Sequence, residues 1–81
     1  MIPLLSHVMG LVLQVDPATI SESAEMGGVE NWDSMQQVVL MSMLEQTYGV
    51  SFSPEEINSS TSVGLIRQAL ARRGVTPAWT E

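Results

Sequence analysis

The sequence predicts an all-α protein, a small four-helix bundle with three longer helices, one short helix and a long first loop. Apolar residues recur at three- and four-residue spacing in three segments, which is the period of a helix that buries one face. Proline and glycine stand between these segments, where helices end. A length of 81 residues suits one small domain with a limited core.

The first helix is predicted from about Pro3 to Gln14 or Val15. Proline suits a first turn because its missing N–H has no helical partner there. The helix ends at Asp16, since a residue before proline disfavours the helical conformation. His7 lies at the edge of the apolar stripe and is expected to be a bystander. The stripe is broad enough for a core helix and comprises Leu4, Leu5, Val8, Met9, Leu11, Val12 and Val15.

Residues 16–32 form a long connection rich in serine, glutamate and glycine. Such a length needs a reason in a small domain. Four apolar residues offer one, because they can pack the connection across the helix ends: Ile20, Met26, Val29 and Trp32. The alternative is a mobile loop, since Gly27-Gly28 is a flexible point.

The second helix is predicted from Ser34 to Tyr48. Asp33 is suited to cap it, because a carboxylate can accept a hydrogen bond from a backbone N–H two or three residues later. Gly49 provides the stop. Ser34 then lies on the first turn, where unpaired N–H groups and the positive end of the helix dipole favour an anion. A serine hydroxyl at this position is suited to carry a phosphate.

This second helix has apolar residues on two faces. One stripe is expected in the core and comprises Leu40, Met41, Leu44 and Tyr48, with Val38 on its flank. The other comprises Met35, Val39 and Met43. A small domain struggles to bury both, so we interpret the second stripe as a docking surface, to which methionine is suited. Trp32, and Glu45 as the helix's only charged residue, are also expected to contact partners. The alternative is a central helix that is buried all round.

A short third helix is predicted after an extended link that places Phe52 in the core. Ser53, Pro54 and Glu56 form the pattern of a capping box, with proline at the first helical position. The helix has one to two turns and ends near Asn58.

The last helix is predicted from about Ser62 to Arg73, with Thr61 as its cap. Val63, Ile66, Ala69 and Leu70 form its apolar face. Arginines in the last turn, Arg72 and Arg73, complement the helix dipole and are expected to be structural, and Gly74 ends the helix. We therefore expect a domain over residues 1–74 and a loosely held tail over 75–81, unless Trp79 packs back against the body.

The composition excludes several classes of function. Nine acidic and three basic residues give a net charge of −6, and the only three cations, all arginines, lie near the C-terminus. A nucleic-acid interface needs clustered cations, so none is expected, whereas a basic protein partner would be attracted. The absence of cysteine excludes a disulfide, a thiolate metal site and a thiol nucleophile. The apolar N-terminal segment has no positive flank and is shorter than the roughly 20 residues that span a bilayer. We expect a cytoplasmic monomer with no membrane insertion and no metal.

A resemblance follows from these residues taken together. An acidic chain of this length has Asp33-Ser34-Met35 at a helix start and an apolar helix that ends in Leu44 to Val50. The short helix at Ser53 to Ile57 and the Thr61 to Val63 start of the last helix follow. The chain resembles the acyl carrier proteins, the phosphopantetheine-bearing carriers that include peptidyl and aminoacyl members. The resemblance extends to Gly74.

The resemblance implies that Ser34 is esterified through a phosphodiester to phosphopantetheine taken from coenzyme A, with Asp33 and Met35 completing the attachment motif. The thiol of that arm would carry acyl, aminoacyl or polyketide intermediates as thioesters, and the chain itself would catalyse nothing. The implied partners are a phosphopantetheinyl transferase, a loading enzyme and downstream acyl-processing enzymes. Tethering raises the local concentration that each partner enzyme meets.

Two departures from the family pattern bear on the pathway. Met35 replaces the usual leucine, a volume-conserving change. Fatty-acid carriers are often acidic at partner-facing positions that read Gln36, Val39 and Gln46 in this chain. We therefore expect docking to depend less on salt and more on apolar contact. This favours a stand-alone carrier in a specialised pathway, such as polyketide or nonribosomal peptide synthesis, over housekeeping fatty acid biosynthesis.

Two other interpretations stay open at this point. The chain could be a helical interaction module of the same fold without a prosthetic group. It could also be a hydrolase in which Ser34 is the nucleophile, His7 the base and Asp33 its helper, although nothing in the sequence places His7 near Ser34.

Overall fold

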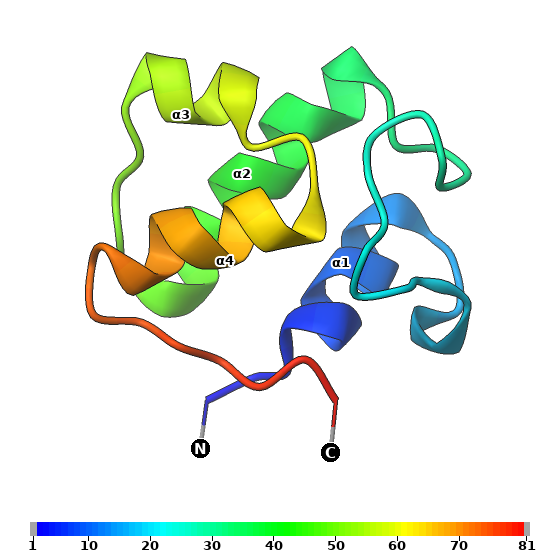
Figure 1. Cartoon of the computed structure of the whole chain (residues 1–81), viewed down its shortest axis with the longest axis horizontal. Coiled ribbons are helices and arrows are strands. Elements are labelled where there is room, and N and C mark those ends of the chain that lie inside the picture. The colour runs from blue at the N-terminus through cyan, green and yellow to red at the C-terminus, as the bar shows by residue number, and fades with distance from the viewer. Residues whose placement is uncertain (1, 81) are drawn as a thin grey trace.

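A computed structural model describes residues 2–80 as a bundle of helices (Figure 1). The helices are α1 (Leu5–Leu13), α2 (Ser34–Tyr48), α3 (Pro54–Ser59) and α4 (Val63–Ala71), with a short 3₁₀ turn, η1, at Pro17–Thr19. No strand forms within these residues, and the nearest feature is an isolated bridge between Glu25 and Ser62. The predicted fold class, a small all-α bundle with three longer helices and one short one, is confirmed.

The helices enclose one hydrophobic core. α1 packs against α2, and α4 crosses in front of α2 (Figure 1). The apolar side chains that are fully or almost fully buried come from every helix except α3 and from the connections between them: Leu5, Val8, Met9, Leu13, Ile20, Trp32, Leu40, Met41, Leu44, Phe52, Val63, Ile66, Ala69, Leu70 and Trp79. No helix within residues 2–80 combines the length and the apolar character needed to cross a membrane.

The long first connection is packed and hydrogen-bonded, so the alternative of a mobile loop is wrong. Ile20 and Trp32 are buried in the core, and Met26 and Val29 pack against it. The Met26 amide donates to the Thr61 carbonyl at 2.8 Å, which ties the connection to the start of α4. The Asn31 side-chain amide donates to the Leu13 carbonyl at 2.8 Å and so satisfies one of the last carbonyls of α1.

Several helix boundaries differ from the prediction. α1 ends at Leu13 rather than at Gln14 or Val15, because Gln14 adopts the left-handed conformation with φ +59°, and α4 ends at Ala71 rather than at Arg73. α1 begins at Leu5 rather than Pro3, because the Leu5 and Ser6 amides donate to tail carbonyls, those of Ala78 and Trp79, at 3.0 and 3.2 Å. The last helix is capped by Ser62, whose hydroxyl accepts from the Leu65 amide at 3.1 Å, and not by Thr61.

The segment after Gly74 also differs from the expectation of a loosely held tail. Trp79 is only 7% exposed and belongs to the core. Together with the two hydrogen bonds to the first turn of α1, it holds the segment around Ala78 and Trp79 beside the start of α1 (Figure 1). The alternative that Trp79 packs back against the body is thus confirmed.

The predicted capping box forms, and the arginines that follow α4 have a structural role, as expected, because they bond to the glutamate of this box. The Ser53 hydroxyl accepts from the Glu56 amide at 3.1 Å, and the Glu56 carboxylate accepts from the Ser53 amide at 3.0 Å. Arg73 donates to the same carboxylate at 2.8 Å and lies over the Phe52 ring, 4.9 Å from its centroid. Hydrogen bonds from Arg73, with smaller contributions from Ser53 and Arg72, hold the pKa of Glu56 far below its usual range. This cluster fixes α3 to the end of α4.

Candidate functional site

The head of α2 forms as its sequence predicts. Asp33 has an extended backbone, and its carboxylate accepts a hydrogen bond from the Gln36 amide at 2.9 Å. The helix therefore begins at Ser34. At the other end, Gly49 adopts the left-handed conformation with φ +68°, which a glycine reaches without strain.

Ser34 is exposed on the first turn of this helix. Among residues 2–80, the backbone amides of Ser34 and Met35 have no acceptor, since the Asp33 side chain takes only the Gln36 amide. An exposed hydroxyl beside two unpaired N–H groups, at the positive end of a helix dipole, suits the bridging oxygen of a phosphodiester. The site fits a covalently attached phosphate group.

Trp32 does not present its ring to partners, and the expectation that it does so is wrong. The ring is 2% exposed, and its Nε1 donates to Gln37 Oε1 at 2.7 Å. Gln37 is itself 3% exposed, and its Nε2 donates to the carbonyls of Ile57 at 3.0 Å and Ser60 at 2.7 Å. Sequence reasoning missed Gln37. The sequence does contain an indication of its role, because Gln37 is a polar residue on the otherwise apolar stripe of α2, one helical turn before Leu40 and Met41.

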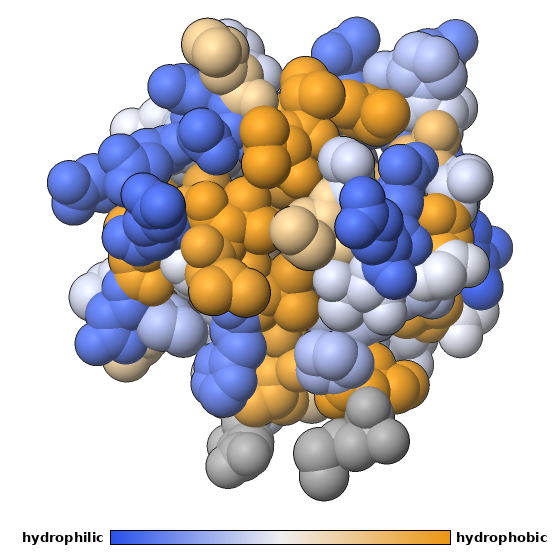
Figure 2. Space-filling view, turned by 180° about the vertical axis from the view of Figure 1, so that it is seen from behind, coloured by the Kyte–Doolittle hydropathy of each residue, from blue (hydrophilic) through white to orange (hydrophobic). Residues whose placement is uncertain are grey.

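The outer face of α2 is apolar from its first turn to its last third. Met35 is 78% exposed, Val39 49% and Met43 37%, as expected for the second stripe. Val38, assigned to the flank of the core stripe, is 53% exposed and extends this outer face instead. In Figure 2, apolar side chains gather into a band on the side of the molecule where α2 lies, behind α4 in Figure 1. We call Met35, Val38, Val39 and Met43 the α2 outer face.

Glu45 lies at the edge of this face and is only partly exposed. Its carboxylate accepts a hydrogen bond from the Phe52 amide at 2.7 Å, which fastens the link after α2. One oxygen of the Glu45 carboxylate is thus engaged within the chain, and contact of Glu45 with partners stays a prediction. The α2 outer face has no charged residue of its own.

His7 is not part of the site. It is exposed on α1 and lines a shallow apolar hollow with Leu11, Val15 and Pro17. No hydrogen bond within residues 2–80 joins it to Ser34 or Asp33, and the Asp33 carboxylate is engaged by the Gln36 amide. The catalytic constellation of the hydrolase interpretation is not assembled.

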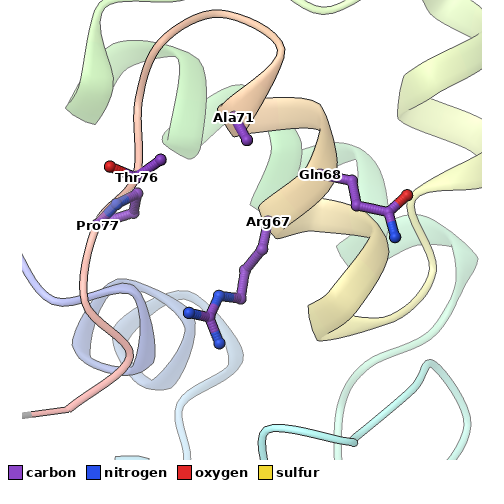
Figure 3. A pocket seen from close by; sticks show the side chains of 5 residues that line it. All are labelled: Arg67, Gln68, Ala71, Thr76 and Pro77. Atoms are coloured by element: carbon purple, nitrogen blue, oxygen red, sulfur yellow. The ribbon is translucent and has the colours of Figure 1, made fainter.

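Two other hollows help to delimit the site. A polar one beside the head of α2 is lined by Gln14, Asn31, Asp33 and Gln36, with Val12 and Leu13 behind them. Another lies between α4 and the tail, and Figure 3 shows Arg67, Gln68, Ala71, Thr76 and Pro77 around it. It contains no residue of α2. Within residues 2–80 there is no group of three or more histidine or acidic side chains that could hold a metal ion.

The comparison with known families decides the class of protein. A family model described as a phosphopantetheine attachment site matches residues 4–70, which is well over half of the chain. The chain belongs to this family. No curated protein and no solved structure matches the chain significantly.

Membership establishes the general role of the carrier. Domains of this family hold a covalent phosphopantetheine and act as acyl carriers without catalysis, so the chain is a carrier and not an enzyme. Carriers of this kind interact with a phosphopantetheinyl transferase and with acyl-processing enzymes. When bound, the arm supplies a thiol, which the cysteine-free chain lacks, and that thiol holds the acyl group as a thioester.

Proposed function

We propose that Ser34 is the attachment residue and that the protein is a stand-alone carrier of acyl, aminoacyl or polyketide intermediates. The observation that supports this most directly is the exposed Ser34 hydroxyl at the head of α2, beside two unpaired amides. Asp33 acts by capping the helix, which holds the first turn and therefore the hydroxyl in place. Met35 completes the motif and begins the α2 outer face.

The α2 outer face is the proposed docking surface for the transferase, the loading enzyme and the downstream enzymes. It starts one residue after Ser34, so a partner that covers it also reaches the arm. Because Met35, Val38, Val39 and Met43 are uncharged, complex formation depends mainly on apolar contact and little on salt. This feature supports a specialised pathway, of the polyketide or nonribosomal peptide kind.

The proposed carrier domain spans residues 1–74. In the tail that follows, residues 75–80 close the end of the bundle at α1, through Trp79 and the carbonyl of Ala78. The stand-alone state is tested by the intact mass of the protein isolated from its native cell.

Modification of the pure protein tests the attachment residue. The apo-protein is incubated with coenzyme A, magnesium and a broad-specificity phosphopantetheinyl transferase, and its intact mass is then measured by mass spectrometry. We expect the mass to increase by one phosphopantetheine in the wild type and in Ser42→Ala, a control that removes another exposed α2 hydroxyl. Ser34→Ala should gain nothing. An unmodified wild type would favour the interaction module without a prosthetic group, and an equal gain in Ser34→Ala would contradict the assignment of Ser34.

A further inference from the structure

Directly below the first turn of α2, a buried polar cluster joins three parts of the chain. Gln37 is at its centre, and its side chain makes three hydrogen bonds, to Trp32 Nε1 at 2.7 Å, to the Ile57 carbonyl at 3.0 Å and to the Ser60 carbonyl at 2.7 Å. Trp32 ends the first connection, and Ile57 and Ser60 lie in and just after α3. We call these four residues the polar latch.

The polar latch closes the bundle on the side of α3. Trp32, Gln37 and Ser60 are each at most 3% exposed, and Leu40, Met41 and Leu44 farther along α2 are fully buried. An acyl chain on an arm at Ser34 that entered the core between α2 and α3 would have to separate Gln37 from Ile57 and Ser60. That would leave a buried amide and two carbonyls without partners, which is far more costly than breaking the same bonds in water.

An apolar load on a flexible arm would gain free energy by entering a core, in proportion to the methylenes it buries. The polar latch opposes this gain about one helical turn from Ser34, at Gln37. Breaking the latch has a fixed cost, whereas the gain rises by about 0.8 kcal/mol with each buried methylene, so a short or polar load gains too little to open it and stays outside.

Given the proposed attachment at Ser34, we propose that the polar latch keeps the load outside the bundle, and that the cargo is a short or polar acyl group, such as an aminoacyl group, rather than a long alkyl chain. Gln37 is the specificity-determining residue. It does not touch the arm, and it acts by holding Trp32 and the end of α3 in place.

A series of loads tests the proposal. The apo-protein is loaded with acetyl, hexanoyl and decanoyl arms from amide-linked coenzyme A analogues, which survive heating, and the melting temperature of each form is measured. We expect the three values to agree within about 2 °C. Each methylene that enters the core would raise the melting temperature by roughly 3–6 °C, so a progressive rise with chain length would overturn the proposal.

A second measurement locates the load. The indole N–H signal of Trp32 reports on its hydrogen bond to Gln37. We expect its NMR chemical shift to be the same in all three loaded forms. A shift that grows with chain length would place the load in the latch and overturn the proposal.

A variant tests the role of Gln37. Gln37→Met keeps the length of the side chain and removes its hydrogen bonds, and Gln68→Met makes the same change at an exposed position on α4. We expect a rise of melting temperature with chain length in Gln37→Met alone. If Gln37→Met is folded by circular dichroism and shows no such rise, Gln37 is not the determinant. If Gln37→Met does not fold, the Trp32 indole shift in the loaded wild-type forms decides whether the load enters the latch.

Failure of this proposal is distinguishable from failure of the carrier assignment. A wild type that takes up no arm contradicts attachment at Ser34. A wild type that is loaded but stabilised by long chains contradicts only the restriction on cargo.

Discussion

A charge placed on the α2 outer face should weaken docking without unfolding the protein. Val39 is 49% exposed and Met35 78%, so Val39→Glu and Met35→Glu leave the core intact. Surface changes of this kind alter the free energy of unfolding by no more than about 0.5 kcal/mol. In a complex, however, the new carboxylate meets an apolar interface and loses water without gaining a partner.

The expected effect on transfer follows from that desolvation. A cost of about 2–3 kcal/mol corresponds to a loss of roughly 30- to 150-fold in kcat/KM. The assay is the rate at which a phosphopantetheinyl transferase modifies each variant under subsaturating conditions. Leu11→Glu is the matched control, because Leu11 is 77% exposed on α1 and lies outside the proposed surface.

Two results would refute this reasoning. If the α2 variants lose several kcal/mol of stability in urea unfolding, their side chains belong to the core. If Leu11→Glu slows transfer as much as Val39→Glu, the effect is a general one of added negative charge and not a property of the α2 outer face.

Three further predictions concern stability. Because Arg73 lowers the pKa of Glu56 from its ordinary 4.5, the pair contributes stability that is fully present above that pH and is lost as the pH falls through the folded-state value. Glu56→Gln should therefore lower the melting temperature at pH 7, and the melting temperature of this variant should fall less steeply than that of the wild type as the pH is lowered. An equally steep fall in the variant would contradict the pairing. Asp33→Ala should cost about 0.5–2 kcal/mol in urea unfolding, while Asp33→Ser should recover most of it, since serine also caps helices. Trp79→Ala should cost roughly 3–5 kcal/mol, as for other buried tryptophans, and a loss no greater than that of the exposed Thr80→Ala would mean that the tail is not part of the core.

The parts of the fold with local causes could be predicted from the sequence. α2 begins and ends as expected because Asp33 and Gly49 act on neighbouring backbone groups. The capping box of α3 is equally local, since Ser53 and Glu56 satisfy each other's amides.

The features that were mispredicted depend on segments far apart in the chain. α1 starts late because the tail supplies carbonyls to Leu5 and Ser6, more than 70 residues away. The sequence position of Trp32 fits either a docking surface or a core anchor, and only the burial of its ring and its hydrogen bond to Gln37 distinguish the two. Val38 lies near the border between the two faces of α2, where a small rotation of the helix decides its exposure.

The central claim is that Ser34 carries the arm, and peptide mapping of protein purified from its producing cells tests it most directly. Trypsin is unsuitable because Arg67 is the first cationic side chain, but cleavage after glutamate releases residues 31–45 as one peptide. That peptide contains both Ser34 and Ser42, and fragmentation assigns the modified residue. We expect phosphopantetheine on Ser34. A bare Ser34, or an arm found on Ser42 or elsewhere, would contradict the account.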